Sequence, residues 1–190
     1  MNPWLIVLLI VIAIIVLVVI FIWGSYNSLV RLNERVNEAW SDITVQLKRR
    51  ADLIPNLVET VKGYAKHESE AIKAVSDARA KMMGARSVKA TAEADNSFTG
   101  ALNKLMAVSE AYPELKADKN FQQLASEISD TEDKVQAARR FYNAGAKELN
   151  TKVQMFPINL FGGFGFKKRE YYEVDEAEKA KIANAPEVKF

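Results

Sequence analysis

The sequence predicts an all-α protein in which an N-terminal transmembrane helix continues into an antiparallel four-helix bundle with long first and last helices. An irregular aromatic tail is expected at the C-terminal end. Three observations carry this prediction. They are a run of twenty apolar residues from Trp4 to Trp23, an apolar stripe with helical spacing after it, and a seven-residue repeat between Phe121 and Leu149.

These patterns divide the chain into three predicted segments. Residues 1–23 form an N-terminal tail and transmembrane helix, residues 24–155 form the helical bundle, and residues 156–190 form a tail rich in Phe and Gly. Every charged side chain lies after the first of these segments. The membrane segment and the body therefore have to be considered separately.

The apolar run is long enough to cross a bilayer. An α-helix rises about 1.5 Å per residue, so a run of this length matches the roughly 30 Å hydrocarbon layer. Trp4 and Trp23 stand at its two ends, where amphipathic rings lie at headgroup level, and we expect both to anchor the span. A cleaved signal peptide is the alternative, but its apolar core is usually about 7 to 15 residues long and follows a basic segment.

The distribution of basic residues predicts the orientation. Residues 1–3 contain no Lys or Arg, whereas Arg31 and Arg35 follow the span. Because Lys and Arg are enriched on the cytoplasmic side, the N-terminus is expected outside and the body in the cytoplasm. The absence of cysteine fits a reducing compartment without proving one.

The first body helix is predicted from its apolar spacing. From Leu29 to Ala65, ten steps between apolar residues cover 36 positions, a mean of 3.6, which is the repeat of a helix that buries one face. Pro55 lies within this stripe, and because proline lacks the N–H and clashes with the preceding turn, we expect a kink just before it. The helix is expected to run on directly from the membrane span.

Two shorter helices are expected next. One begins near Glu68 and ends around Gly84, and the other covers Phe98 to Ser109, with a polar link between them. The second of these ends before Tyr112, because the following proline disfavours a helical residue ahead of it.

The last helix carries a heptad pattern. Its first seam consists of Phe121, Ile128, Val135, Tyr142 and Leu149. Its second seam becomes smaller along the helix, through Leu124, Thr131, Ala138 and Gly145. Such a repeat predicts coiled-coil packing, and the small Ala138 and Gly145 would admit another helix closely, so both are candidates for self-association. Asn120 and Gln123 resemble a capping box at its start, and Phe156-Pro157 marks its end.

The tail differs in composition from the helices. Residues 156–174 read FPINLFGGFGFKKREYYEV, in which Phe and Gly alternate before a basic cluster. One interpretation is an irregular segment folded back on its own bundle. The other is that its aromatic and basic residues contact a neighbouring subunit or the membrane interface, which makes Phe161, Phe164 and Phe166 candidates for self-association.

The sequence offers little for catalysis or for polyanion binding. The 26 basic and 24 acidic side chains nearly cancel, so nucleic acid is not an expected partner. His67 is the one histidine, and without a second histidine or any cysteine it is expected to be an ordinary turn residue. We therefore expect no catalytic, cofactor-binding or metal-ligating residue.

Two groups of charged residues are interpreted as solvated helix faces. Glu34, Glu38 and Asp42 share one face and are expected to pair with arginines rather than to hold a cation. The run from Lys48 to Arg50 is followed by an aspartate, so a salt-bridged face is favoured over a polyanion patch.

Two long stretches carry a resemblance to a known family. Residues 26–68 read YNSLVRLNERVNEAWSDITVQLKRRADLIPNLVETVKGYAKHE, and residues 110–150 read EAYPELKADKNFQQLASEISDTEDKVQAARRFYNAGAKELN. Together with the later FP, FGF and closing PEVKF, they closely resemble the LemA family. Ala51 departs from this pattern, since an aromatic residue is expected between KRR and DLIPNLV, and the packing there is open to change.

The resemblance implies a bacterial or archaeal membrane protein with a short outer N-terminus, one span and a cytoplasmic antiparallel four-helix bundle. The expected location is therefore the bacterial inner membrane. It also implies no established enzymatic activity. Some relatives take part in shaping internal membranes, as in magnetosome formation, and others are encoded beside HtpX-type membrane proteases.

Two functions remain open from the sequence. The first is a homo-oligomeric scaffold that holds or remodels the lipid bilayer through its long helices and aromatic tail. The second is an adaptor that binds a different membrane protein, such as an HtpX-type protease. A ligand-sensing bundle is less favoured, because the sequence contains no cluster of polar groups that would form a pocket.

Overall fold

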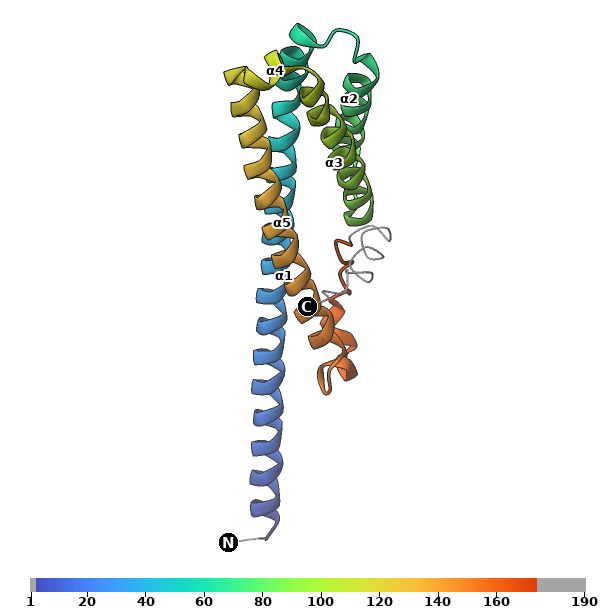
Figure 1. Cartoon of the computed structure of the whole chain (residues 1–190). Coiled ribbons are helices and arrows are strands. Elements are labelled where there is room, and N and C mark those ends of the chain that lie inside the picture. Colours follow the sequence, from blue (N-terminus) through green and yellow to red (C-terminus); the bar gives the residue numbers. More distant parts are fainter. Residues whose placement is uncertain (1–2, 174–190) are drawn as a thin grey trace, which may run out of the picture. The chain divides into compact units, whose positions relative to one another are not determined.

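The structure, a computed structural model, describes residues 3–173, with the backbone alone at residues 161 and 162. Its elements are α1 (Pro3–Tyr64), α2 (Ser69–Gly84), α3 (Val88–Ala111), α4 (Pro113–Ala117), α5 (Lys119–Gln154) and the 3-10 helix η1 (Ile158–Gly165) (Figure 1). Within the described part of the chain there are helices and no strands, which confirms the all-α class.

The contacts divide the chain into two compact units, each of which is described by itself. Unit 1 comprises residues 1–38 and 144–169, and unit 2 comprises residues 39–143 and 170–190. The closing PEVKF and the rest of the tail from residue 174 lie outside the described residues.

α1 changes its surroundings along its 62 residues. Its side chains from Trp4 to Phe21 are exposed within the chain, and among the described residues it is the one helix long and apolar enough to cross a membrane by length and composition. From Leu29 onward the predicted apolar stripe is buried, apart from Trp40, which is half-buried. The periodicity therefore identified the buried face correctly.

α1 runs without interruption through Pro55. Since Pro55 has no N–H, it cannot donate to the carbonyl oxygen of Ala51, four residues earlier. That oxygen instead accepts a 2.8 Å hydrogen bond from Nε of Arg79 in α2. A side chain from a neighbouring helix thus replaces the backbone donor that proline removes.

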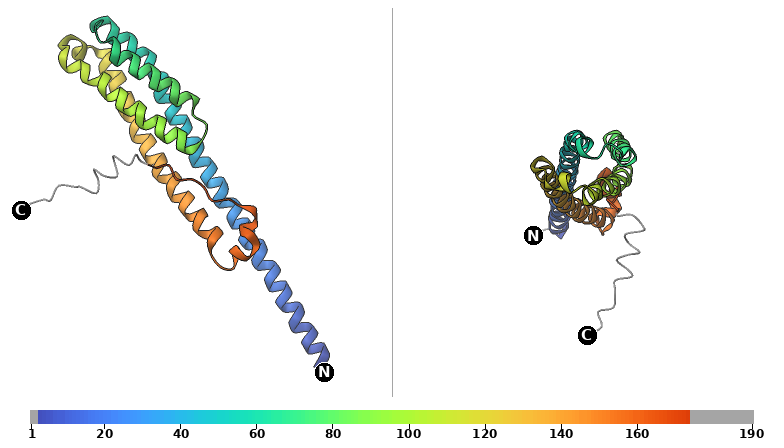
Figure 2. Two further views of the ribbon diagram at one scale, coloured as in Figure 1. Left: turned by 90° about the vertical axis from the view of Figure 1, so that its right-hand side faces the viewer. Right: turned by 45° about the horizontal axis from the view of Figure 1, so that its top comes forward.

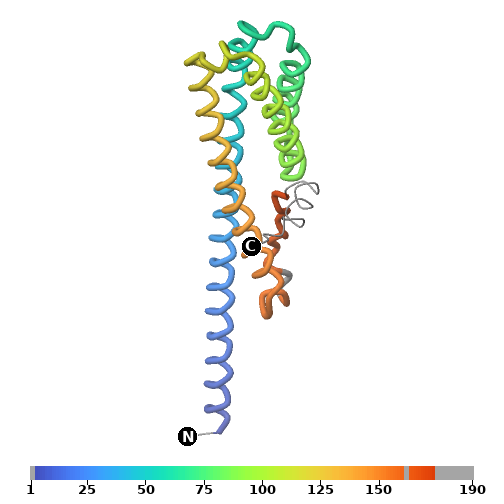
Figure 3. Tube along the Cα trace, viewed as in Figure 1, coloured from blue at the N-terminus to red at the C-terminus, as the bar shows by residue number. Residues whose placement is uncertain are grey.

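In unit 2, α2 packs along α3, and α5 runs beside the C-terminal half of α1 in the opposite direction (Figures 2 and 3). The predicted start and end of α2 are confirmed within one residue. α3 differs from the prediction, because it begins at Val88 and so takes in most of the expected polar link. Ser87 caps it by accepting a hydrogen bond from the backbone N–H of Ala90.

The start of α5 also differs from the expected capping box. Asp118, not Asn120, caps the helix, because its carboxylate accepts the backbone N–H of Phe121 at 2.9 Å. The heptad residues themselves are all buried: Phe121, Ile128, Val135, Tyr142 and Leu149.

In unit 1, the last turns of α5 and η1 pack against α1 (Figure 2). Gly145 is buried, and a Cβ added to it would lie 3.2 Å from Cγ2 of Val36, so the helices approach closely there. The segment after α5 is not irregular as expected, since residues 158–165 form η1. Gly163 permits this turn, because it has φ +60° and an added Cβ would lie 2.6 Å from Val153.

Candidate functional site

Unit 2 contains a cluster of buried charged side chains, the most unusual feature of its core. It comprises Arg50 of α1, Asp95 of α3, Glu132 and Arg139 of α5, and Tyr172 of the tail. Charged residues are almost never fully buried unless they are paired. With two arginines and two carboxylates, the cluster is balanced in charge.

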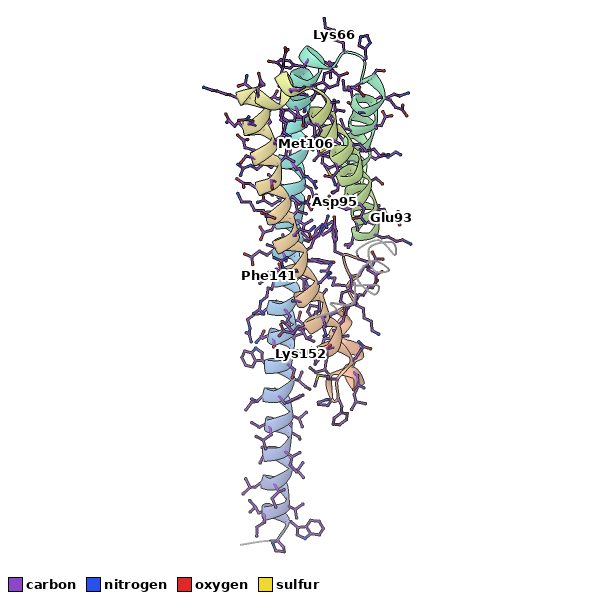
Figure 4. The ribbon with its side chains drawn as sticks, viewed as in Figure 1. Lys66, Glu93, Asp95, Met106, Phe141 and Lys152 are labelled. Carbon is purple, nitrogen blue, oxygen red and sulfur yellow. The ribbon has the colours of Figure 1, made fainter. Side chains whose placement is uncertain are left out.

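Asp95 is the centre of the cluster. It is 0% exposed and lies on α3, where Figure 4 labels it. One carboxylate oxygen accepts hydrogen bonds from Nη2 of Arg139 and, at 2.6 Å, from the hydroxyl of Tyr172. The other oxygen accepts from Nη1 of Arg50 at 3.3 Å. A single carboxylate therefore links α1, α5 and the tail to α3.

Arg50 makes the second set of contacts. Its Nη1 lies 2.5 Å from an oxygen of Glu132 and donates to Oγ1 of Thr99 at 3.1 Å. Its guanidinium carbon lies 5.1 Å from the ring centroid of Phe98, a cation–π distance. The sequence placed this residue on a salt-bridged solvent face, and that expectation is wrong for Arg50, because its side chain is buried. Lys48 of the same run does pair with Asp52 at the surface.

The two arginines of the cluster respond differently to burial. For Arg50, the loss of water outweighs the attraction of Glu132 and Asp95, and its pKa is lowered. For Arg139, burial also opposes the charge, but the field of Asp95 and its hydrogen bond outweigh it, and the pKa is raised. Both guanidinium groups remain charged at neutral pH, because an arginine side chain loses its proton only in strongly alkaline solution.

Tyr172 brings the tail into the cluster. Its side chain is 2% exposed, and burial, followed by the charge of Asp95, raises its pKa far above the usual range. The phenol therefore keeps its proton and donates to Asp95 at physiological pH. The ring also packs 4.9 Å from the Arg139 guanidinium carbon and 6.4 Å from the ring centroid of Trp40.

The backbone of the tail is held by an asparagine side chain in unit 2. Nδ2 of Asn143 donates to the carbonyl oxygen of Tyr172, and Oδ1 of Asn143 accepts the N–H of Tyr172, at 2.9 and 2.8 Å. The Tyr142 hydroxyl donates to the carbonyl oxygen of Glu170 at 2.9 Å. Side chains of α5 thus form hydrogen bonds with main-chain groups of the tail, as the backbone of a neighbouring strand does in a sheet.

Unit 1 repeats the same arrangement. Nδ2 of Asn150 donates to the carbonyl oxygen of Arg169, and its Oδ1 accepts the N–H of Arg169, at 2.9 and 2.7 Å. The guanidinium of Arg169 donates to Oδ1 of Asn33 and of Asn37, both at 2.8 Å. We call Asn143 and Asn150 the asparagine clamps. The interpretation of the tail as folded back on its own chain thus holds for residues 166–172.

The charged groups of the cluster are paired with one another and join the elements that carry them. In the part of the chain that the structure describes, no group of three or more His, Cys, Asp or Glu is placed to hold a metal. What the arrangement does is fix the tail to three helices through one buried carboxylate.

The candidate site residues from the sequence occupy varied positions. Trp4 and Trp23 are exposed on α1, as a pair of membrane anchors requires. Ala138 is half-buried and Gly145 is buried within unit 1. The rings of Phe164 and Phe166 each lie 5.9 Å from the ring of Tyr26 in the same chain, and the side chain of Phe161 lies outside the described residues.

Sequence reasoning did not identify Arg50, Asp95 or Tyr172 as members of a buried cluster. A signal for two of these was present. Arg50 follows Leu47 by three residues, and Asp95 precedes Phe98 by three, so both continue a buried stripe. No pattern in the sequence identified Tyr172.

Comparisons with known proteins agree on one family. The sequence model of the LemA family matches residues 39–190, which is most of the chain. Magnetosome protein MamQ 2 of Paramagnetospirillum magneticum is 27% identical over 175 residues, covering 78% of this chain and 64% of the relative. Protein LemA of Metamycoplasma hominis is 32% identical over 141 residues, covering 72% of this chain and 63% of the relative. The chain thus spans somewhat less than two thirds of each of these curated relatives.

Proposed function

This chain belongs to the LemA family, and from this membership we propose that it is a membrane-anchored structural protein that associates with copies of itself into a scaffold. The family and the apolar start of α1 support a membrane-associated protein. Self-association into a scaffold goes beyond membrane association and needs its own support. The single observation that carries it is an exposed apolar strip on the outer side of α5.

That strip consists of Ala137, Phe141 and Ala144, which are all exposed and stand four and three residues apart on one face of the helix. Phe141, labelled in Figure 4, is 55% exposed although α5 buries its heptad seam on another face. A large ring between two small residues offers both a knob and the space to receive one. We propose that α5 meets α5 of a second copy along this strip.

The proposed scaffold stands on a particular topology. The C-terminal half of α1 together with α2, α3 and α5 forms an antiparallel four-helix bundle. The apolar start of α1 is the single span that anchors this bundle in the membrane. The span crosses a bacterial inner membrane, with the N-terminus outside and the bundle on the cytoplasmic side. The basic residues that follow the span, Arg31 and Arg35, support this orientation.

We further propose that the scaffold is non-enzymatic and acts on the bilayer that it is anchored in. Three of the similar relatives bear the name magnetosome protein, and the family resemblance includes proteins that shape internal membranes. The buried cluster supports a structural role, since its polar groups are directed at one another and at the tail.

Photo-crosslinking in cells tests the scaffold. A photoreactive phenylalanine analogue replaces Phe141 in the full chain, with the analogue at exposed Met83 of α2 as matched control. The expected result is a ladder of self-adducts from position 141 and none from position 83. One stable adduct with a different protein, such as an HtpX-type protease, would replace the scaffold by the adaptor, and no adduct at all would contradict both.

A charge substitution tests the same surface in purified protein. Phe141→Lys should convert the detergent-extracted oligomer to a monomer by mass photometry, because lysines facing each other across a symmetric contact repel. Met83→Lys should leave the oligomer unchanged. If the parent chain is itself a monomer, self-association is wrong.

A further inference from the structure

The turn that follows α5 presents apolar side chains to its surroundings. Met155, Phe156 and Leu160 are 56%, 76% and 69% exposed, whereas Ile158 between them is buried. The turn is therefore two-sided, with Ile158 packed inside unit 1 and the other three side chains directed outward. Exposed apolar groups that gather in one place mark an interaction surface.

The position of this turn on α1 indicates what covers it. Tyr26 contacts Phe164 of η1 and Phe166 just after it, with 5.9 Å between ring centroids in each case. Tyr26 follows Trp23, the last residue of the apolar run, by three positions, which is about 4.5 Å along a helix axis. η1, which continues from the turn, is thus held close to the end of the apolar run of α1.

A second contact fixes the same placement. Nζ of Lys152 donates to Oγ of Ser28 on α1 at 2.5 Å, and Figure 4 labels Lys152 at this end of α5. Ser28 is only five residues beyond Trp23. Both attachments lie within unit 1, so they describe one compact body that includes the end of the span.

Basic residues predominate around the turn. Residues 149–169 contain Lys152, Lys167, Lys168 and Arg169 and no acidic residue, and the first charged residue after the span is Arg31. Basic residues next to the membrane are attracted to an anionic lipid surface. Apolar side chains combined with cations are the pattern of segments that lie in the headgroup region.

We propose that residues 155–160, which we call the interfacial turn, form a second contact with the membrane. Met155, Phe156 and Leu160 enter the interface of an anionic bilayer beside the end of the span, while the lysines meet lipid phosphates. The occupant of this surface is the lipid bilayer itself. The proposal uses the anchoring of α1 but not self-association, so the two can fail separately.

Spin-label depth measurements test the interfacial turn. Because the chain has no cysteine, Phe156→Cys and Leu160→Cys can each carry one nitroxide on the full-length protein, in phosphatidylcholine vesicles containing phosphatidylglycerol, at no more than one chain per vesicle. Both labels should collide more often with oxygen than with a water-soluble nickel complex. The label at exposed Val45→Cys in unit 2 should show the reverse.

The lysines provide an independent readout. Lys167→Gln combined with Lys168→Gln should move the label at position 156 toward water, and vesicles without phosphatidylglycerol should have the same effect. The control Lys66→Gln should change nothing. The proposal would be overturned if the labels at 156 and 160 were accessible to nickel in all vesicles. It would also be overturned if the labels were accessible to nickel in dilute vesicles and showed spin–spin broadening when each vesicle holds more chains, because a second copy would then be the occupant.

Discussion

Asp95 shows how much one residue can determine in a helical core. Its carboxylate has partners on α1, α5 and the tail, so its loss leaves two guanidinium groups in the interior with Glu132 as the remaining anion. A buried charge without a partner costs far more than the pair contributes in net terms. The cluster is therefore fragile to single substitutions, whatever its net stability.

Asp95→Ala should lower the free energy of unfolding by about 3 to 5 kcal/mol, because it removes the carboxylate that Arg50 and Arg139 share inside unit 2. Urea unfolding of the detergent-extracted protein, followed by circular dichroism, measures the change. The control Asp77→Ala, at an exposed position of α2, should cost less than about 0.5 kcal/mol. Equal costs for the two variants would show that the cluster is not a stability determinant.

At the scale of single residues, the sequence predicted apolar positions much better than polar ones. Leu29, Val36 and Ile43 were placed correctly because a stripe has a period that can be counted. Arg50 was placed on the surface because it ends a basic run that an aspartate soon follows, although its own spacing from Leu47 and Ile54 is that of a core residue. Composition outweighed periodicity in that prediction, and periodicity was right.

Helix α1 is the element in which sequence and tertiary contacts conflict most. Pro55 removes a backbone donor in the middle of a long helix, which costs about 3 kcal/mol in an isolated helix. The hydrogen bond from Arg79 to the carbonyl oxygen of Ala51 offsets part of this loss. The sequence indicated the difficulty at Pro55, but only the fold identifies the side chain that relieves it.

This arrangement predicts coupling between the two positions. Arg79→Ala should cost about 1 to 2 kcal/mol in the parent chain, since it leaves a helix carbonyl without its donor. In a Pro55→Ala background the cost should nearly vanish, because residue 55 then supplies the donor. A double-mutant cycle by urea unfolding measures the coupling, with exposed Arg86→Ala as control. Additive effects would show that Arg79 does not serve the freed carbonyl.

The start of α5 predicts a dependence on pH. Hydrogen bonds from the backbone of Phe121 and from the Tyr64 hydroxyl lower the pKa of Asp118 below its usual 3.8. A lowered pKa stabilises the fold above the unfolded value, and this contribution is lost as pH falls through the folded value. The advantage of the parent over Asp118→Asn should therefore be largest near neutral pH and shrink below about pH 4.

Urea unfolding of both proteins between pH 2 and pH 7 measures this difference. Asp130→Asn, at an exposed position of α5, controls for the loss of one negative charge. A constant difference between the parent and Asp118→Asn across the whole range would contradict the assignment of Asp118 as the ionised cap.

For the whole molecule, the helices were predictable and the course of the tail was not. Long periodic patterns identified α1, α2 and α5, since each buries a face whose spacing the sequence displays. The tail is held by Asn143 and Asn150, which bind its backbone and not its side chains. No hydrophobic pattern records such a pairing.

The orientation of the whole chain is open to a direct measurement. Lys66 is exposed in the turn between α1 and α2, where Figure 4 labels it, and the chain has no cysteine of its own. In intact cells, Lys66→Cys should resist a membrane-impermeant maleimide and should react after lysis. Labelling in intact cells would reverse the topology and place the body outside the cytoplasm.

The buried ions of unit 2 also bear on how the protein responds to heat. The hydration of charged groups carries a strongly negative entropy, so the free-energy cost of removing Arg50, Asp95 and Arg139 from water falls as the temperature rises. Their confinement in the interior becomes less unfavourable at the same time as the gain from apolar burial levels off. The contribution of this ionic cluster to the stability of the fold therefore becomes more favourable at higher temperature.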